Sequence, residues 1–406
     1  MSNTILTPTA VTREALRILH QKLNFVGSID RQYDDQYAKT GAKIGDSLKI
    51  RLPNEYTVRT GRAIAVQDTT ESSVTLQVAT QKGVDMAFTS VDLTLSLDDF
   101  SKRILEPAMS VLAANIEYDA MSMYKSVYNE ISDVGASAST LLAMGVGQVL
   151  TDSLAPISPR CLNVPTQYNV DLVEAVKGLF NDPSKISKNY REGMIGSNFL
   201  GFSDVYQNTL WPIHTTGTDD GTGDYLVNDA GTIAQGSTSI TVDTGAGTWA
   251  IGDIFYFDSV NSVHAETKAS TGKLKSFVIT AAAGVSATTI SFSPALYSTG
   301  ASQNVSAMPA NNAKLNKVES DRSTPIGASA DYSIGMGYHK DAFAFATADL
   351  VMPKGLDFAS REVMDGISMR IVRDYDINND NLPCRLDVLY GYKTVRPELA
   401  CRFGLH

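Results

Sequence analysis

The spacing of apolar residues changes several times along the chain, and each change predicts a different element. Near the N-terminus, Thr12 precedes REALRILHQKLNF, whose apolar residues recur at helical spacing, so we expect a capped amphipathic helix there. From Ile44 to Ser96 apolar and polar residues alternate, which predicts antiparallel strands of an extended sheet with one apolar and one solvated face. The alternating runs are LKIRL (48–52), YTVRT (56–60), SVTLQVAT (73–80) and VDMAFTSVDLTLS (84–96).

A long helical pattern follows the alternating region. Asp98 and Asp99 can cap a helix, and apolar residues keep helical spacing from Phe100 to Ile131. Pro107 must either kink this helix or open its second, longer part, because proline is tolerated in a first turn. The part after Pro107 alone would measure on the order of 35–40 Å. Such a helix would form the backbone of a flat or elongated domain.

Residues 217–320 differ in composition from the rest of the chain. They contain no arginine and are rich in Gly, Ser, Thr and Ala, whereas the flanking regions have ordinary charge and helical periodicity. Short β-like runs occur within them at 237–242, 254–257, 275–280 and 288–293. This segment therefore predicts a small β domain inserted into a larger, discontinuous domain.

The rest of the chain alternates between helical and strand patterns. VDLVEAVKGLFND at 170–182 predicts a helix that ends before Pro183. After the insert, the segments at 332–352 and 385–395 have the aromatic and β-branched composition of strands. The 406 residues allow two or three domains.

Charge and composition exclude several classes of protein. The 34 basic and 44 acidic residues give a net charge of −10, and no basic tract is present. Sequence-independent DNA binding depends on lysine and arginine, so this protein would enclose DNA more readily than grip it. No apolar run approaches the roughly 20 residues needed to span a bilayer, and MSNTILTPTAVTREAL lacks the features of a signal peptide. We therefore expect a cytoplasmic, globular chain.

No group of residues predicts metal binding. The histidines are scattered, without HExxH or i,i+4 spacing, at His20, His214, His264, His339 and His406. DYDINND, beginning at Asp374, starts like a calcium loop, but Asn379 replaces the required glycine and Arg385 the bidentate glutamate. We interpret it as a polar turn. The acidic TDDGTGD segment at 218–224 is expected to be a solvated linker rather than a cation site.

Catalytic signatures are also missing from the sequence. It contains no GxSxG and no Walker-type loop, and the pairs Gly145/Gly147 and Gly335/Gly337 lack the third glycine of a dinucleotide loop, so they are interpreted as turn or packing glycines. Three cysteines form no CxxC pair and are expected to be buried thiols: Cys161, Cys384 and Cys401. We predict no enzyme, and no catalytic, cofactor-binding or metal-binding residues.

The order of the predicted parts resembles the major coat protein fold of tailed bacteriophages. That α+β fold has an N-arm, an extended loop, a spine helix in a peripheral domain, and an axial domain. Particular phrases resemble the coat proteins of short-tailed Salmonella-type phages, which carry an inserted β-barrel-like domain in the axial domain. The phrases are YREGMIGSNFLGFSDVYQN running into LWPIHTTGT, WAIGDIFYFDSVNSV, LKSFVIT, YHKDAFAFATADL and LYGYKTVRPELACRFGL. They include the Gly252–Asp253 turn and the Arg396–Pro397–Glu398 corner.

The resemblance implies a division of the chain into six parts. These are an N-terminal arm with a helix (1–43), an extended β loop with peripheral-domain strands (44–97), a spine helix (98–140), the first part of the axial domain (141–216), the inserted β domain (217–320), and a second axial and peripheral part (321–406). The extended loop would lie across a neighbouring subunit. The insert would aid folding and contact neighbours through a projecting charged loop, although it has few charges beyond Glu266, Lys268, Lys273 and Lys275 in its later part.

The resemblance also implies a function and partners. The chain would be a major capsid protein that self-assembles through pentamers and hexamers into an icosahedral shell around double-stranded DNA. A scaffolding protein and the portal protein would be partners, DNA would be enclosed without sequence-specific binding, and no membrane would be involved. Assembly would take place in the host cytoplasm, and the protein would end in the virion capsid.

Two finer expectations concern flexibility and the inner face. Four glycines border the predicted hairpin and are hypothesised to act as hinges, at Gly41, Gly45, Gly61 and Gly83. The resemblance suggests that the N-terminal helix, with Arg13, Arg17 and Lys22, faces scaffold or DNA; a solvated helix face is the alternative.

Two other functional classes stay open at this point. A phage tail or receptor-binding protein would account for the Ser-, Thr- and Gly-rich β segment, but such chains usually lack a spine-type helix. An enzyme with an undetected site is the other alternative.

Overall fold

The structure is a computed structural model, which describes the greater part of the chain. The described residues are 8–31, 47–64, 66–67, 71–88, 101–134, 139–176, 200–219, 225–229, 233–243, 245–318, 326–353, 355, 358–364, 366–375 and 382–405. The chain forms two compact units. The first unit comprises Met1–Arg51, Ser73–Met121 and Phe343–Val395, and the second comprises Leu52–Ser72, Ser122–Ala342 and Arg396–His406.

The first unit contains a five-stranded antiparallel sheet. Its strands are β3 (Thr80–Phe88), β14 (Phe343–Ala348), β15 (Phe358–Met364), β16 (Ile367–Arg373) and β17 (Leu382–Thr394). The long strand β17 is central, because β3 pairs along one of its edges while β16 and β14 share the other. Two of the segments expected to be strands, 84–96 and 385–395, thus lie side by side as far as the described residues extend.

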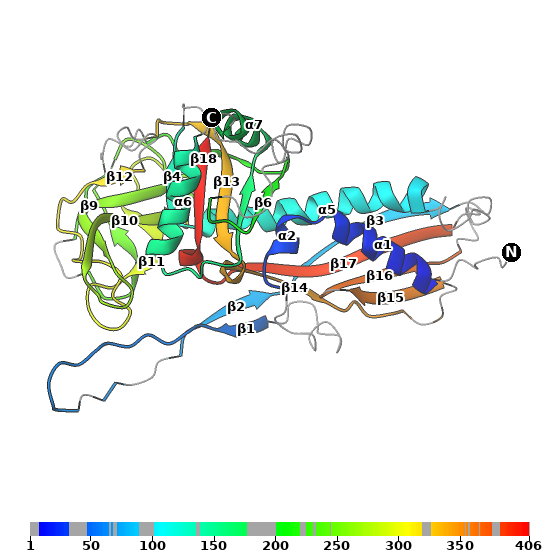
Figure 1. Cartoon of the computed structure of the whole chain (residues 1–406), viewed down its shortest axis with the longest axis horizontal. Helices are drawn as coiled ribbons and strands as arrows, with labels where there is room; N and C mark the ends of the chain where they lie inside the picture. Colours follow the sequence, from blue (N-terminus) through cyan, green and yellow to red (C-terminus); the bar gives the residue numbers. More distant parts are fainter. Residues whose placement is uncertain are drawn as a thin grey trace. The chain divides into compact units, whose positions relative to one another are not determined.

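Helices cover this sheet. They are α1 (Pro8–Lys22), the single turn α2 (Phe25–Ser28) and α5 (Glu106–Met121). Helix α1 contacts α5 and β15 and buries Ala15, Leu16 and Leu19 in that contact (Figure 1). The predicted cap at Thr12 is wrong, because the helix begins at Pro8 and Thr12 is fully buried within it.

Helix α5 is shorter than the sequence pattern predicted. A π-helical turn (Ser101–Leu105) precedes it, and Pro107 lies in its first turn, as one of the two predicted alternatives required. Its 16 residues span about 24 Å. The helical prediction to Ile131 is wrong, since a 3₁₀ turn ends at Ser126 and Ile131 lies in a strand. That strand forms by pairing with Phe403, far away in sequence, which local periodicity cannot indicate.

A hairpin in the first unit leads into a long loop. Strands β1 (Ser47–Arg51) and β2 (Ser73–Gln77) are antiparallel, with Ser47 opposite Gln77 and Arg51 opposite Ser73. Each strand buries one apolar side chain, Ile50 and Leu76 respectively. The chain between the two strands belongs to the second unit.

The second unit contains a mixed six-stranded sheet. Its strands are β4 (Glu130–Ser132), β5 (Arg160–Val164), β6 (Asp204–Gln207), β7 (Ile213–Thr215), β13 (Asp331–His339) and β18 (Ala400–Leu405). The order is β4-β18-β13-β5-β6, and β7 pairs with β13 beside β5. Helix α6 (Thr140–Asp152) packs against β18, and α7 (Thr166–Val176) packs against α6. A Cβ at Gly335 would overlap the Phe403 ring and one at Gly337 would overlap Val146, so this glycine pair serves close packing.

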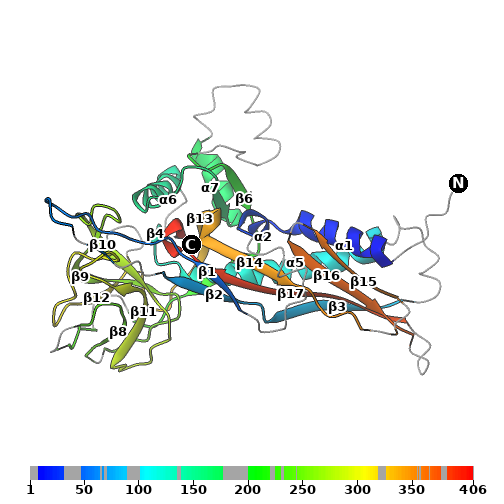
Figure 2. The same cartoon turned by 90° about the horizontal axis from the view of Figure 1, so that it is seen from below.

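The same unit contains a closed β structure, which we call the barrel (residues 225–318). Its strands are β8 (Ser237–Thr241), β9 (Ile254–Val263), β10 (Ser270–Ile279), β11 (Thr289–Leu296) and β12 (Leu315–Lys317), in the order β12-β9-β10-β11-β8 (Figure 2). The short segment at 225–228 bridges the two end strands, because Leu226 pairs with Lys314 and Val227 with Val242. The four runs predicted as strands within 217–320 correspond to β8, β9, β10 and β11.

Aromatic side chains fill the barrel. Phe255 contacts four other rings at centroid distances of 5.1–6.0 Å, those of Trp249, Phe257, Phe277 and Phe292. The chain enters and leaves the barrel at neighbouring points, since the amide of Thr216 donates to the carbonyl of Ala330 at 3.0 Å and that of Ser329 to Gly217 at 3.1 Å. The barrel therefore has a core of its own and a narrow connection to the chain around it.

Candidate assembly surfaces

The loop at 52–72, which we call the extended loop, is held together by very few bonds. At its base the Leu52 amide donates to the Ser72 carbonyl at 2.9 Å. Further out, the Thr57 amide donates to Gln67 Oε1 at 2.8 Å, and Gln67 Nε2 donates back to the Thr57 carbonyl at 2.6 Å. In Figure 1 the loop continues beyond β1 and β2 without strands or helices in its described part. The strand predicted at 56–60 is wrong, because those residues have no ladder of backbone bonds.

Apolar side chains of the extended loop point into solvent. Tyr56 is 56% exposed, Val58 91%, Ile64 83% and Val66 87%. Residues of this type usually lie in a core, and four of them on one short loop form an exposed apolar surface. Arg59 curls back to donate to the carbonyls of Gly61 and Ala63, which orders the tip. The loop is thus shaped locally, while its four apolar side chains listed above are each more than half exposed.

The proposed hinge glycines have different environments. Gly61 lies in the extended loop with φ of +100°, a conformation that favours glycine. Gly83 instead lies inside β3, opposite Asp387, where an added Cβ would overlap the Leu386 carbonyl and the Asp387 side chain. The close approach of β17 therefore explains Gly83 without a hinge. Gly41 and Gly45 lie outside the described residues.

The charged residues of the barrel are mostly engaged inside the subunit. Lys273 Nζ lies 2.6 Å from Asp152 Oδ2 on α6, and both side chains are at least half exposed. Lys275 Nζ lies 4.4 Å from the centroid of the Tyr128 ring, and burial lowers the pKa of this lysine to about 8. Lys268 Nζ donates to the Gln303 carbonyl at 3.4 Å. Three of the four charged residues noted in the later part of the insert thus have partners within their own subunit.

The basic residues of α1 also lie near carboxylates. Arg17 pairs with Glu14 at 2.6 Å, Arg13 with Glu362 at 3.6 Å, and Lys22 with Glu106 at 4.0 Å. These pairs are solvent-exposed and contribute little to stability. They do reduce the positive charge that the helix presents, which disfavours strong binding to phosphates.

The candidate metal residues do not come together in the described part of the chain. No group of three His, Cys, Asp or Glu residues is arranged to hold a metal ion there. The segment DYDINND, interpreted from the sequence as a polar turn, falls largely outside the described residues, as does most of the acidic segment at 218–224. Asp219, at the start of that segment, is buried rather than part of a solvated linker.

The three cysteines are buried and unpaired, as predicted. Burial raises the pKa of Cys161 to about 11 and that of Cys384 to about 12, and it raises the pKa of Cys401 further. Such thiols hold their protons at neutral pH and are poor nucleophiles.

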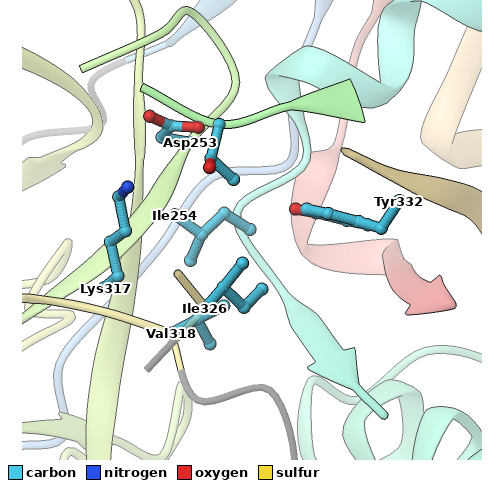
Figure 3. Close-up of a pocket in the computed structure, with 7 residues that line it drawn as sticks. Asp253, Ile254, Lys317, Val318, Ile326 and Tyr332 are labelled. Atoms are coloured by element: carbon cyan, nitrogen blue, oxygen red, sulfur yellow. The ribbon is translucent and has the colours of Figure 1, made fainter. Parts of the chain in front are cut away.

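A small cavity lies between the barrel and the six-stranded sheet (Figure 3). Asp253, Lys317 and Tyr332 contribute its polar groups, and Ile254, Val318 and Ile326 its apolar wall. Its volume of about 10 Å³ is near the lower limit for one water molecule. The Lys317 ammonium already donates to the carbonyls of Gly217 and Asp219. The cavity is therefore a packing feature and not a ligand site.

Comparison with known proteins decides the family. The family described as "P22 coat protein - gene protein 5" matches residues 13–404 of this chain. The chain belongs to the P22 coat protein family. It is therefore a major capsid protein, which forms the shell of a tailed-phage virion, and its α+β fold is that of a capsid protein. This membership also decides against the tail-protein alternative.

Solved structures show the similarity at low sequence identity. A structure from Mycobacterium phage Che8 is 13% identical with a TM-score of 0.47, covering 94% of this chain and 90% of the other. The capsid structure of the cyanophage P-SCSP1u is 8% identical with a TM-score of 0.42, covering 90% and 84%. The mature capsid of bacteriophage PhiM1 is 10% identical with a TM-score of 0.40, covering 92% and 83%. No curated protein matches the chain.

Proposed function

We propose that this coat protein self-assembles through pentamers and hexamers into an icosahedral lattice that encloses double-stranded DNA. The extended loop supports this proposal most directly, because Val58, Ile64 and Val66 present apolar surface that only a second subunit would cover. Burying such a side chain is worth about 1.5–3 kcal/mol. Covering a few of them would contribute to association, while the free subunit stays folded without them.

The partners of this coat protein are also proposals. We propose that a scaffolding protein and the portal protein take part in assembly in the host cytoplasm, as the family resemblance implies. DNA is enclosed without sequence-specific binding, which fits the net charge of −10 and the paired basic residues of α1. The protein acts as a structural component and has no enzymatic activity.

The domain assignment is also a proposal. Helix α5 corresponds to the spine helix of the peripheral domain, and the six-stranded sheet to the axial domain. The barrel corresponds to the inserted domain, supported by its closed strand order, its aromatic core and its neighbouring entry and exit points.

Serine substitutions in the extended loop test the proposal. The triple variant Val58→Ser, Ile64→Ser, Val66→Ser should fold with a free energy of unfolding within about 0.5 kcal/mol of the unmodified subunit, since the side chains are exposed. It should fail to form particles with scaffolding protein, as seen by size exclusion and negative-stain microscopy.

The matched control is Val285→Ser on the barrel, which is 61% exposed. This variant should assemble as the unmodified protein does. Normal particles from the triple loop variant would contradict a role of the loop in covering a neighbour.

A further inference from the structure

A buried polar group joins the barrel to the six-stranded sheet. Asp253 lies just before β9, at the base of the barrel, and is 2% exposed. Its Oδ2 accepts the amides of Ala250 at 2.8 Å and Gly217 at 3.0 Å, and its Oδ1 lies 3.0 Å from Nε2 of His214. Nδ1 of His214 lies 3.1 Å from the Tyr124 hydroxyl. An imidazole that donates from Nε2 to Asp253 can accept the Tyr124 proton at Nδ1, so both ring nitrogens are satisfied.

An ion pair lies beside this group. Arg402 on β18 is fully buried, and its Nε donates to Glu130 Oε2 on β4 at 2.6 Å. Its Nη2 donates to the carbonyl of Gly252, in the barrel turn that also contains Asp253. Tyr332 on β13 donates its hydroxyl to Glu130 Oε1 at 3.3 Å. We call Glu130, His214, Asp253 and Arg402 the clasp.

Both charges of the ion pair are removed from water. Burial by itself would lower the pKa of Arg402, but the Glu130 carboxylate raises it above its ordinary value. The guanidinium therefore stays protonated. Its Nη1 is buried without a hydrogen-bond partner among the described residues.

The buried ion pair is not expected to add much to the stability of the fold. A buried ion pair often stabilises a fold no more than apolar side chains of the same shape would, because both ions lose their hydration. Apolar contacts are already present at this junction, where Tyr128 packs against Ile254 and Val278 of the barrel. Apolar contacts have no preferred direction, whereas hydrogen bonds to charged groups weaken steeply when their geometry changes.

We propose that the clasp fixes the orientation of the barrel on the six-stranded sheet, and that this orientation is required for a subunit to join the lattice. Only one placement of the barrel brings the Gly252 carbonyl to Arg402 and the Asp253 carboxylate to His214. Pentamers and hexamers would be built from the same subunit, so a barrel that packs at several angles would disturb contacts throughout the lattice. The inference rests on the shell function and adds to it residues that are buried inside the subunit.

Two variants separate the orientation of the barrel from the stability of the subunit. One removes a single partner of the Glu130–Arg402 ion pair, and the other replaces both partners with apolar residues. Arg402→Met alone leaves the Glu130 charge buried and should lower the unfolding midpoint strongly. The double variant Glu130→Leu, Arg402→Met removes both charges and should keep a midpoint close to that of the unmodified subunit. It should nevertheless give irregular particles or none.

Hydrogen exchange provides the second readout. The Gly217 amide donates to the Asp253 side chain, whereas the Thr280 amide donates to Ser291 inside the barrel. In the double variant, exchange at Gly217 should be faster by about tenfold or more while exchange at Thr280 is unchanged, because the junction opens locally and the barrel does not. Lys273→Met, which breaks the exposed contact with Asp152, is the control and should change neither exchange nor particles.

Regular particles from the double variant, or unchanged exchange at Gly217, would overturn the proposal. If the double variant does not fold, the isosteric Asp253→Asn substitution is judged by the same two measurements. Failure of the shell function itself would look different, because the unmodified subunit would then form no particles while exchange at Gly217 stayed slow.

Discussion

The extended loop and the barrel of this coat protein differ in where their apolar side chains lie. Those of the barrel are buried in its core, and those of the loop are exposed to solvent. The barrel closes its sheet through the segment at 225–228 and fills its interior with aromatic rings. The extended loop has three hydrogen bonds between Thr57 and Gln67 and leaves its valines and isoleucine exposed. The barrel is stabilised by its own core, whereas the loop leaves most of its apolar surface exposed. Substitutions should accordingly affect folding in one region and assembly in the other.

The largest expected effect is in the barrel core. Phe255→Ala removes a fully buried ring that contacts four others, so it should lower the free energy of unfolding by about 3–5 kcal/mol. Urea denaturation of the free subunit, followed by tryptophan fluorescence, measures the loss. A loss below 1 kcal/mol would mean that the barrel is not the self-sufficient region that its core indicates.

The next largest expected effect is a pH dependence of stability. It comes from the first unit, outside both the extended loop and the barrel. Glu117 on α5 is almost fully buried and accepts the amides of Phe25 at 3.1 Å and Val26 at 3.2 Å. Burial raises the pKa of Glu117 from 4.5 to about 7, although these amides act in the opposite direction. The folded state therefore holds the proton more tightly than the unfolded state does. The stability contributed by this group should be full below pH 4.5 and lost as the pH rises through 7, by about 3 kcal/mol in total.

Glu117→Gln should remove this part of the pH dependence. Unfolding midpoints of both proteins at pH 5, 6, 7 and 8 provide the comparison, in which other titrating groups cancel. Parallel pH profiles for the two proteins would show that Glu117 is not the group responsible.

The smallest expected effect is a difference in stability between two glycine variants, one in the five-stranded sheet and one in the extended loop. Gly83→Val would force a side chain into the β17 backbone and should cost about 1–3 kcal/mol in the free subunit. Gly61→Ala, in the extended loop, meets open space and should cost about 1 kcal/mol or less, from its positive φ alone. Thermal unfolding of the two variants measures the difference. Equal losses would mean that Gly83 is as free as a loop residue, and would restore its interpretation as a hinge.

The sequence predicted elements best where the pattern that defines them is local. The strands β8 to β11 alternate over short runs bounded by turn residues, and all four were found. The helix over 100–131 was overextended because Ile131 fits the helical spacing, yet its position is decided by pairing with Phe403. The prediction of a strand at 56–60 was wrong for the opposite reason. Its alternation is real, but the described chain supplies no partner strand.

The buried polar contacts could not be predicted at all. His214 and Asp253 are separated by 39 positions, and Glu130 and Arg402 by 272, so no motif joins them. The Gly252–Asp253 turn was noticed only because it occurs in a phrase that resembles a coat protein family. Its chemical role depends on residues from four strands of the sheet, β4, β7, β13 and β18, whose proximity exists only in the folded chain.

The neighbouring entry and exit of the barrel make it an exchangeable module. Thr216 and Ala330 are joined by a backbone hydrogen bond, so a turn of a few residues would close the chain if the barrel were absent. A replacement domain would also have to supply the contacts that Gly252 and Asp253 make with Arg402 and His214. The same junction is a defined point at which protein engineers can test the insertion of a foreign domain into the subunit.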